Sequence, residues 1–175
     1  MLDKEDRRAL VVLDTPLGWI ALVGRGEVLE QLSFGHPSAQ AAVRALDPAL
    51  VATASRATWN PSLVRLLLAY AAGRRADFSD VQIDPGPLSA FQRRVVQHCR
   101  QIPYGKTLSY GALAAKAGSS RAARAVGNCM AANRIPLVVP CHRVLPASGQ
   151  PGAFSAHGGV KTKRRLLAME AGSAF

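Results

Sequence analysis

Cysteine and histidine are scarce and scattered in this chain of 175 residues. The three cysteines are Cys99, Cys129 and Cys141, and none belongs to a Cys-x-x-Cys pair. The four histidines, at positions 36, 98, 142 and 157, are equally dispersed. An odd number of cysteines without such pairs argues against a disulfide framework and against a zinc ribbon. We therefore expect no structural metal and no cofactor.

The chain also lacks a run of about 18 apolar residues, the length that a membrane-spanning helix needs. Its first eight residues are mostly charged and lead directly into a strand-like segment, which is not the layout of a secretory signal peptide. These absences predict a cytoplasmic protein without membrane segments. Because 49% of the residues are hydrophobic, the length suffices for one compact domain or two small ones.

Acidic residues are almost missing from the second half of the chain. Residues 1–86 hold nine Lys or Arg and ten Asp or Glu, a net charge of −1, whereas residues 87–175 hold 13 Lys or Arg and one acid, a net charge of +12. Such asymmetry indicates a polyanionic partner, and nucleic acid is the favoured one. A generic solubilising surface is the alternative, although solubility does not require the removal of every acid except Glu170.

The change in charge coincides with the clearest linker, Asp-Pro-Gly-Pro at residues 84–87. We predict an N-terminal structural domain over residues 1–86 and a C-terminal domain over residues 87–175. In the first domain, turn residues separate three apolar segments, which predicts a meander of three strands. The predicted elements of this α/β half are strands at 9–13, 19–23 and 28–34, helices at 37–46 and from Asn60-Pro61 onwards, and a short strand within 78–83.

Helical spacing dominates the second domain. Ser89 is placed to cap a helix with Val95 and Cys99 on its buried face. Ser109 is placed to cap a second, short helix, and the turn at 118–120 contains serines that are again placed to cap. A third helix follows over residues 121–132. Two short helices around a glycine-containing turn predict a helix-turn-helix, although other helical hairpins share this pattern.

The helix predicted at 121–132 has two different faces. Val126 and Cys129 fall on the inward face, so we interpret Cys129, like Cys99, as a core residue. The outward face holds small residues and one long cation: Arg124, Gly127, Asn128 and Ala131. Such a face suits close approach to a minor groove of DNA better than reading of base edges. Close packing against a neighbouring domain is the alternative.

The motif Pro140-Cys141-His142-Arg143 follows an apolar run at residues 135–139. This run, bounded by prolines, predicts a short buried strand that ends in a turn. The turn presents a thiol next to His142 and Arg143, the kind of neighbours that lower the pKa of a cysteine and make it nucleophilic. A lone cysteine is more often a small buried hydrophobic residue, so the pair by itself is weak evidence.

Glu170 follows two apolar residues of the last helix by three and four positions, so it is predicted to point inward. A buried carboxylate needs a partner, and His142 is the one we predict. The result would be a Cys-His-Glu relay, in which the carboxylate orients the imidazole and the imidazole takes the thiol proton. Asn133 is placed either to bridge its helix to the Cys141 turn or to act only as a helix C-cap. The basic cluster at residues 161–165 is interpreted as a solvated face.

Residues 137–144, Leu-Val-Val-Pro-Cys-His-Arg-Val, resemble the active-site signature of the O6-alkylguanine-DNA alkyltransferases, also called methylated-DNA–protein-cysteine methyltransferases. The resemblance continues through Ser109-Tyr110, residues 122–127, Asn133 and residues 166–170. It implies a ribonuclease-H-like α/β half followed by a mostly helical half with a winged-helix or helix-turn-helix motif. It also implies direct-reversal DNA repair. One methyl or alkyl group would pass irreversibly from O6-alkylguanine, or from O4-alkylthymine, to Cys141 after base flipping.

The resemblance also implies roles for individual residues. The catalytic set would be Cys141 as the nucleophile, His142 as the base acting through a water, and Glu170 and Asn133 as its supports. The implied DNA-binding residues are Ser109, Tyr110, Ala123, Arg124, Gly127 and Asn128, with Arg124 filling the gap left by the flipped nucleotide. The implied base pocket is formed by Tyr110, Met130, Pro140, Val144, Phe154 and Ser155. The implied partner is alkylated double-stranded DNA, bound by a monomer without a metal.

The chain departs from the family pattern in the loop at 152–159, which often reads Gly-Tyr-Ser/Gly-Gly-Gly. Phe154 lacks the phenol hydroxyl, and the loop is slightly longer, so the shape of the base pocket and the substrate range stay open. Two other functions fit the residues: a DNA-binding lesion sensor with an inert Cys141, and a hydrolase that uses the Cys-His-Glu relay. The charge asymmetry argues against the hydrolase.

Overall fold

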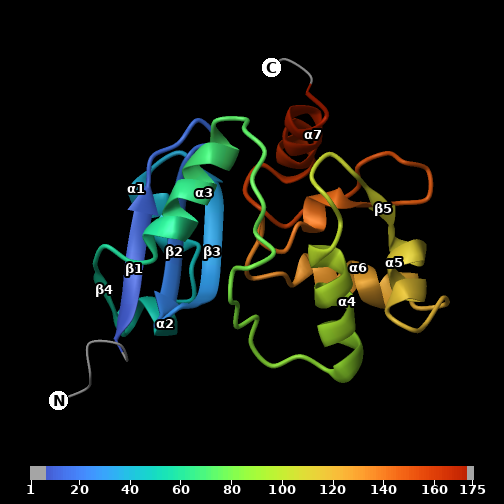
Figure 1. Ribbon diagram of the computed structural model, residues 1–175, viewed down its shortest axis with the longest axis horizontal. Coiled ribbons are helices and arrows are strands. Elements are labelled where there is room, and N and C mark those ends of the chain that lie inside the picture. The colour runs from blue at the N-terminus through green and yellow to red at the C-terminus, as the bar shows by residue number, and fades with distance from the viewer. Residues whose placement is uncertain (1–6, 173–175) are drawn as a thin grey trace. The chain divides into compact units, whose positions relative to one another are not determined.

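The structure, a computed structural model, describes residues 7–172. The chain forms two compact units, and the boundary between them falls between Gly86 and Pro87. The first unit is a sheet with helices, and the second is mostly helical (Figure 1). This composition confirms the predicted mixed α/β fold class. None of the helices within residues 7–172 combines the length and the apolar character that a membrane crossing requires.

The first unit is organised by a four-stranded sheet with the strand order β3-β2-β1-β4. Its strands are β1 (Arg8–Leu13), β2 (Trp19–Arg25), β3 (Val28–His36) and β4 (Ala54–Arg56). The pairs β1–β2 and β2–β3 are antiparallel, which confirms the predicted meander, and β4 pairs with β1 in parallel. Gly24 leaves room for the ring of Trp59, and the indole Nε1 donates to the Gly26 carbonyl at 2.7 Å.

Three helices accompany this sheet: α1 (Ala39–Arg44), α2 (Pro48–Ala52) and α3 (Pro61–Ala71). The predicted cap of α3 is confirmed, because the Asn60 side chain accepts a hydrogen bond from the Leu63 amide. The strand predicted within residues 78–83 is wrong. The Val81 amide donates to the Phe78 carbonyl, which turns the chain, and only Ile83 forms a bridge, to Leu29.

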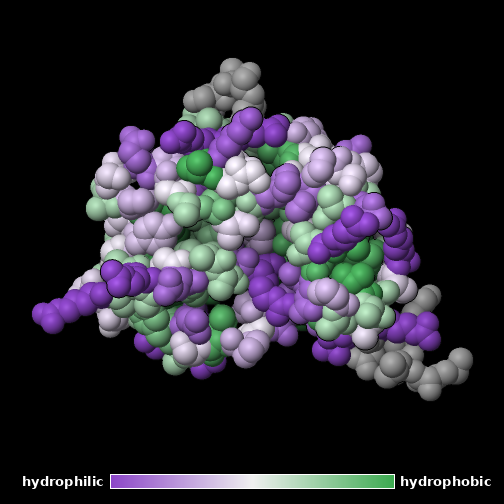
Figure 2. Space-filling model, turned by 180° about the vertical axis from the view of Figure 1, so that it is seen from behind, coloured by the Kyte–Doolittle hydropathy of each residue, from purple (hydrophilic) through white to green (hydrophobic). Residues whose placement is uncertain are grey.

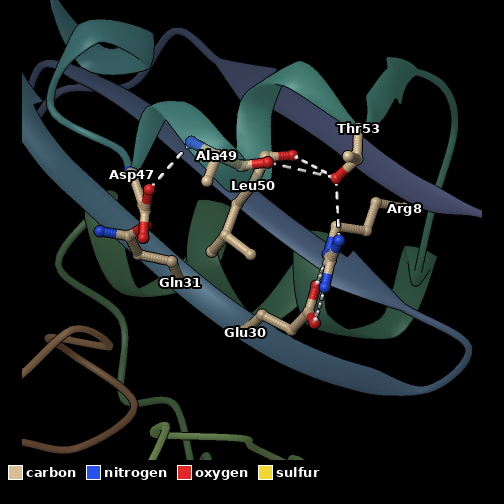
Figure 3. A network of polar contacts seen from close by, with 7 residues as sticks. All are labelled: Arg8, Glu30, Gln31, Asp47, Ala49, Leu50 and Thr53. Atoms are coloured by element: carbon tan, nitrogen blue, oxygen red, sulfur yellow. Dashed lines mark hydrogen bonds and ion pairs between the residues drawn. The ribbon is translucent and has the colours of Figure 1, made fainter.

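A polar network ties the strands of the first unit to α2 (Figure 3). Arg8 of β1 forms two hydrogen bonds to Glu30 of β3, at 2.7 and 3.0 Å, and a third to Thr53 at 2.8 Å. Gln31 accepts from the Asp47 amide at 2.8 Å, and Asp47 caps α2. Glu30 is buried, so its guanidinium partner compensates a carboxylate that would otherwise lose hydration.

Over residues 87–172, the second unit consists of α-helices, a 3-10 helix and a pair of short strands. They are α4 (Ala90–Arg100), β5 (Leu108–Ser109), α5 (Tyr110–Lys116), α6 (Ala123–Ala131), the 3-10 helix η2 (Cys141–Arg143), β6 (Val144–Leu145) and α7 (Gly159–Glu170). Ser89 and Gln92 form a capping box at α4, and Ser109 caps α5, as predicted. β5 and β6 pair in parallel, which joins the start of α5 to the segment after Cys141.

Two predictions for the second unit are wrong. The helix predicted over residues 121–132 is present as α6 and begins at Ala123, but the predicted serine cap is wrong, because the N-cap is Ala122, which makes no side-chain cap hydrogen bond. The run at 135–139 is buried but forms a turn rather than a strand. Leu137 has φ of +72°, a left-handed conformation that no strand accommodates. The winged-helix form of the DNA-binding motif remains a prediction.

Hydrophilic side chains cover much of the surface seen in Figure 2, with hydrophobic areas between them. Among residues 7–172, no group of three or more His, Cys, Asp or Glu side chains is arranged to hold a metal ion. The three cysteines are buried, and none of them forms a disulfide.

Candidate active site

Cys141 begins the 3-10 helix η2, and only Pro140 separates it from the turn at 135–139. The turn holds this position through short backbone hydrogen bonds, from the Cys141 amide to the Val139 carbonyl at 2.8 Å and from the Arg143 amide to the Pro140 carbonyl at 2.9 Å. The Cys141 side chain is almost fully buried, and His142 next to it is completely buried. The local backbone therefore fixes the thiol in an environment that largely excludes water.

Asn133 links α6 to this turn. Its side-chain amide donates to the Val139 carbonyl at 2.9 Å and to Cys141 Sγ at 3.1 Å, and its oxygen accepts from the Ile135 amide at 3.0 Å. The C-cap of α6 is Ala132, so the Asn133 side chain serves the turn rather than the end of the helix. A donor at the sulfur stabilises the thiolate more than the thiol.

Glu170, at the end of α7, is the centre of a buried ionic network. Its carboxylate accepts from His142 Nε2 at 2.7 Å, from Arg143 at 2.9 and 3.0 Å, and from the Gly105 amide at 3.0 Å. Gly105 has φ of +74°, and a Cβ there would approach the Glu170 carbonyl oxygen to 3.0 Å. A glycine is therefore required for the amide to reach the carboxylate.

Arg143 does not have the role that the sequence predicts for it. Its guanidinium grips Glu170 and donates to the Ile102 carbonyl at 2.6 Å, and its Cζ lies 5.8 Å from the centre of the Tyr104 ring. The positive charge of Arg143 is therefore paired with the Glu170 carboxylate and does not contact Cys141. Burial lowers the pKa of His142, although Glu170 opposes this, so the imidazole favours its neutral form.

Lys163 is the cation that sequence reasoning missed. It is 1% exposed, so the interpretation of residues 161–165 as a solvated face is wrong at this position. Its Nζ donates to the Val144 carbonyl at 2.7 Å and to Tyr110 Oη at 3.5 Å. The rings of Tyr110 and Phe154 lie 5.7 and 5.8 Å from Nζ, within the range of cation–π contacts.

The spacing of residues along α7 could have indicated that Lys163 is buried. It precedes Leu166 by three positions and Glu170 by seven, so all three share one face of the helix. Both neighbours on that face are buried, as Lys163 is. A lysine in such a position needs a polar partner, which marks it as a functional candidate.

Burial and charge compete at the thiol. Burial raises the pKa of Cys141, while the hydrogen bond from Asn133, the charge of Lys163 and the backbone amides lower it. Burial in turn lowers the pKa of Lys163, and it raises the pKa of Tyr110. Burial therefore favours the neutral thiol, and Asn133 and Lys163 are placed to stabilise the thiolate once the proton has left.

Comparison with known proteins places this site in a family. Residues 90–172 match the model described as "6-O-methylguanine DNA methyltransferase, DNA binding domain". The methylated-DNA–protein-cysteine methyltransferase of Mycolicibacterium paratuberculosis is 40% identical over 162 residues, which are 90% of this chain and 89% of that protein. The chain belongs to the methylated-DNA–protein-cysteine methyltransferases.

Solved structures agree with this assignment. The O6-methylguanine methyltransferase of Mycobacterium tuberculosis superposes with a TM-score of 0.79 at 35% identity, covering 96% of this chain and 95% of that one. The M. tuberculosis OGT in complex with DNA superposes with a TM-score of 0.72 at 35% identity, covering 94% and 93%. The second of these was solved with DNA bound, which is the partner that the charge of the second half predicts here.

The DNA-binding candidates of this methyltransferase family member lie on α5 and α6. Arg124 and Asn128 are exposed on α6, and Gly127 between them faces open space, since a Cβ there would meet no atom within 4 Å. Ala123 starts α6, and Ser109 and Tyr110 are half-buried at the start of α5. These positions leave one face of α6 with small side chains and one long cation.

The candidates for the base pocket differ in exposure. Met130, Pro140 and Val144 are buried, Tyr110 and Phe154 are half-buried, and Ser155 is exposed. The structure brings Tyr110 and Phe154 together at Lys163, from α5 and from the loop before α7. The other cysteines, Cys99 and Cys129, are buried in α4 and α6, in line with their interpretation as core residues.

Proposed function

We propose that this protein repairs alkylated DNA by direct reversal, moving a methyl or larger alkyl group from O6-alkylguanine, or from O4-alkylthymine, to Cys141. The observation that carries the proposal is the position of Cys141 Sγ, which accepts a hydrogen bond from Asn133 and lies next to His142, the partner of Glu170. The membership in the methyltransferase family supports the reaction class. The second unit would carry both DNA binding and transfer, and the first would be structural.

Access to the lesion requires base flipping, because an alkyl group on O6 of a stacked guanine is out of reach of a buried thiol. The exposed face of α6 would lie in the minor groove, where Gly127 permits close approach of the backbone. Arg124 would enter the stack in place of the flipped nucleotide. Ser109 and Tyr110 would contact the adjacent phosphate at the start of α5.

The flipped base would sit against Met130, Pro140, Val144, Phe154 and Ser155, with Tyr110 at its edge. In the transfer, the new S–C bond forms while the O–C bond breaks, and the electron pair of that bond goes to the guanine. The departing guanine needs one proton. Tyr110, which Lys163 contacts at 3.5 Å, is the group that we propose to donate toward the base.

His142 would take the thiol proton through a bridging water. Its neutral form, which burial favours, suits this role. Glu170 would stabilise the imidazolium that results, and Lys163 would stabilise the thiolate. The imidazolium would return the thiol proton to solvent and Tyr110 would recover its proton from solvent, so no proton is gained or lost over the whole reaction.

The thioether product has no route back to a thiol within this site, so each molecule would react once. A stoichiometric reagent of this kind needs no cofactor and acts as a monomer on its duplex. The cytoplasm would suit the chemistry, because thiols stay reduced there.

The decisive test is transfer of a labelled methyl group from duplex DNA to the protein. Cys141→Ser is expected to abolish labelling while the affinity for undamaged duplex stays within about twofold, because the change is isosteric and buried. Labelling retained by Cys141→Ser would reject the mechanism. Duplex binding without labelling of the wild-type protein would favour a lesion sensor instead.

A further inference from the structure

A small pocket lies in the second unit where α4 and α5 end. Its volume is about 170 Å³, and the segment between the two helices, residues 102–108, supplies most of its wall. The catalytic and DNA-binding roles proposed above use none of the side chains that line it.

Four polar side chains on this wall offer hydrogen-bond donors to a ligand: Gln101, Lys106, Thr107 and Lys116. Lys106 and Lys116 bring two positive charges, Thr107 brings a hydroxyl, and His98 and Gln101 stand at the end of α4. His98 Nδ1 and Gln101 Oε1 are 3.2 Å apart, so the amide oxygen is engaged and the Gln101 NH₂ is left for a ligand. No carboxylate lines the pocket, and the single acid of the second half, Glu170, is bound to Arg143.

Apolar side chains complete the wall. Ile102, Pro103 and Leu108 form a hydrophobic floor beneath the cationic groups. A small anion with an attached hydrophobic ring fits such a surface, since lysine ammonium groups bind phosphate as point charges and a sugar ring packs on aliphatic carbon. From this combination we infer that the pocket binds a sugar–phosphate unit, and that its occupant is the backbone of duplex DNA.

A favourable interaction with a helix dipole accounts for only one of the two lysines. Lys116 lies in the last turn of α5, where a cation complements the helix dipole. Lys106 lies outside any helix, in a turn where its amide donates to the Pro103 carbonyl at 3.0 Å. Its presence beside Lys116 is accounted for by a shared anionic ligand.

The same segment also contacts the candidate active site. The Ile102 carbonyl accepts from Arg143, the Gly105 amide donates to Glu170, and Tyr110 follows Leu108 by two residues. Lys106, which would hold the phosphate, therefore precedes Tyr110 by only four residues. The assignment of this phosphate to DNA rests on the proposed function.

The first experiment compares undamaged duplex binding by the wild type and by Lys106→Gln/Lys116→Gln across salt concentrations. The loss of one phosphate contact is expected to reduce the slope of log K against log salt by about 0.9 and the affinity by roughly tenfold near 0.1 M salt. Arg74→Gln/Arg75→Gln, an exposed pair in the first unit with the same charge change, is expected to keep the wild-type slope. An unchanged slope in the lysine variant, or an equal fall in the control, would overturn the inference.

A second experiment measures ligand binding to the pocket in the absence of DNA. Inorganic phosphate and deoxynucleoside monophosphates are titrated while the amide resonances of Lys106 and Thr107 are followed, and saturable shifts are expected in the wild type only. Shifts with unchanged duplex binding would keep the phosphate site but assign it to free nucleotides. Methyl transfer to Cys141 is measured in parallel, so that a failure of the proposed function is recognised separately from a failure of the pocket.

Discussion

The side chain of Asn133 joins the Val139 carbonyl to Cys141 Sγ, with its amide 2.9 Å from the first and 3.1 Å from the second. The sulfur is thereby held by a side chain from the segment that follows α6. The same hydrogen bond counteracts the effect of burial on the thiol pKa.

Asn133→Ala is expected to slow methyl transfer roughly tenfold to a hundredfold, because hydrogen bonds to charged groups contribute about 1.5–3 kcal/mol. The pKa of Cys141 should rise, since a group that favours the thiolate is lost. The pH dependence of Cys141 alkylation by iodoacetamide, read by peptide mapping, measures this directly. A slower transfer with an unmoved alkylation profile would show that Asn133 acts only on the shape of the turn.

Lys163→Met removes the buried cation near the thiol. We expect the rate of transfer to depend on pH with a midpoint above that of the wild type, because loss of the positive charge raises the pKa of Cys141. Lys161→Met, at an exposed position of α7, is the matched control and should leave the profile in place. Identical profiles for both variants would remove Lys163 from the reaction.

Glu170→Gln breaks a buried network and leaves Arg143 without its carboxylate. The expected loss in the free energy of unfolding is about 3–5 kcal/mol, the cost of an uncompensated buried charge. Chemical denaturation measures it, and Glu170→Gln/Arg143→Met should recover part of the loss because the orphaned charge is gone. A loss below about 0.5 kcal/mol, as for a surface substitution, would contradict the network.

Acid is expected to destabilise the second unit through His142. Burial lowers its pKa in the folded state below the ordinary value of 6.5, so the unfolded chain binds the proton more readily. The stabilising contribution is therefore complete above pH 6.5 and is lost as the pH falls toward the folded-state pKa. Denaturation curves at several pH values should show a shallower dependence for His142→Gln, and an unchanged dependence would mean that other groups cause it.

Arg124→Ala is expected to reduce the repair of duplex lesions at least tenfold, while the reaction with free O6-alkylguanine changes little. The reason is that Arg124 acts on the gap in the stack and not on the sulfur. Single-turnover rates on both substrates provide the comparison, with Arg74→Ala as the charge-matched control. Equal losses on the two substrates would exclude a flipping role.

Local chemistry made much of this fold predictable. Asn60, Ser89 and Ser109 cap the helices that their side chains predict, because a cap depends on residues within one turn. The prediction fails at Leu137, a buried residue of the apolar run whose backbone is left-handed. Hydrophobic pattern alone does not distinguish a buried strand from a buried turn.

The candidate site was predictable to the extent that its residues are neighbours in sequence or share a helix face. The pairing of Glu170 with His142 follows from a single acid on a buried face. The capture of Arg143 by the same carboxylate was not predictable, since it depends on where α7 passes the turn. The burial of Lys163 was not predicted, because its three neighbouring cations suggested a solvated surface.

The central claim is that Cys141 is the acceptor of the alkyl group. Intact-protein mass spectrometry after incubation with duplex DNA carrying a single O6-methylguanine, followed by peptide mapping, tests it most directly. We predict a gain of one methyl group on Cys141, ending at one group per protein molecule even with DNA in excess. An unmodified protein, or a methyl group on Cys99 or Cys129 instead, would contradict the account.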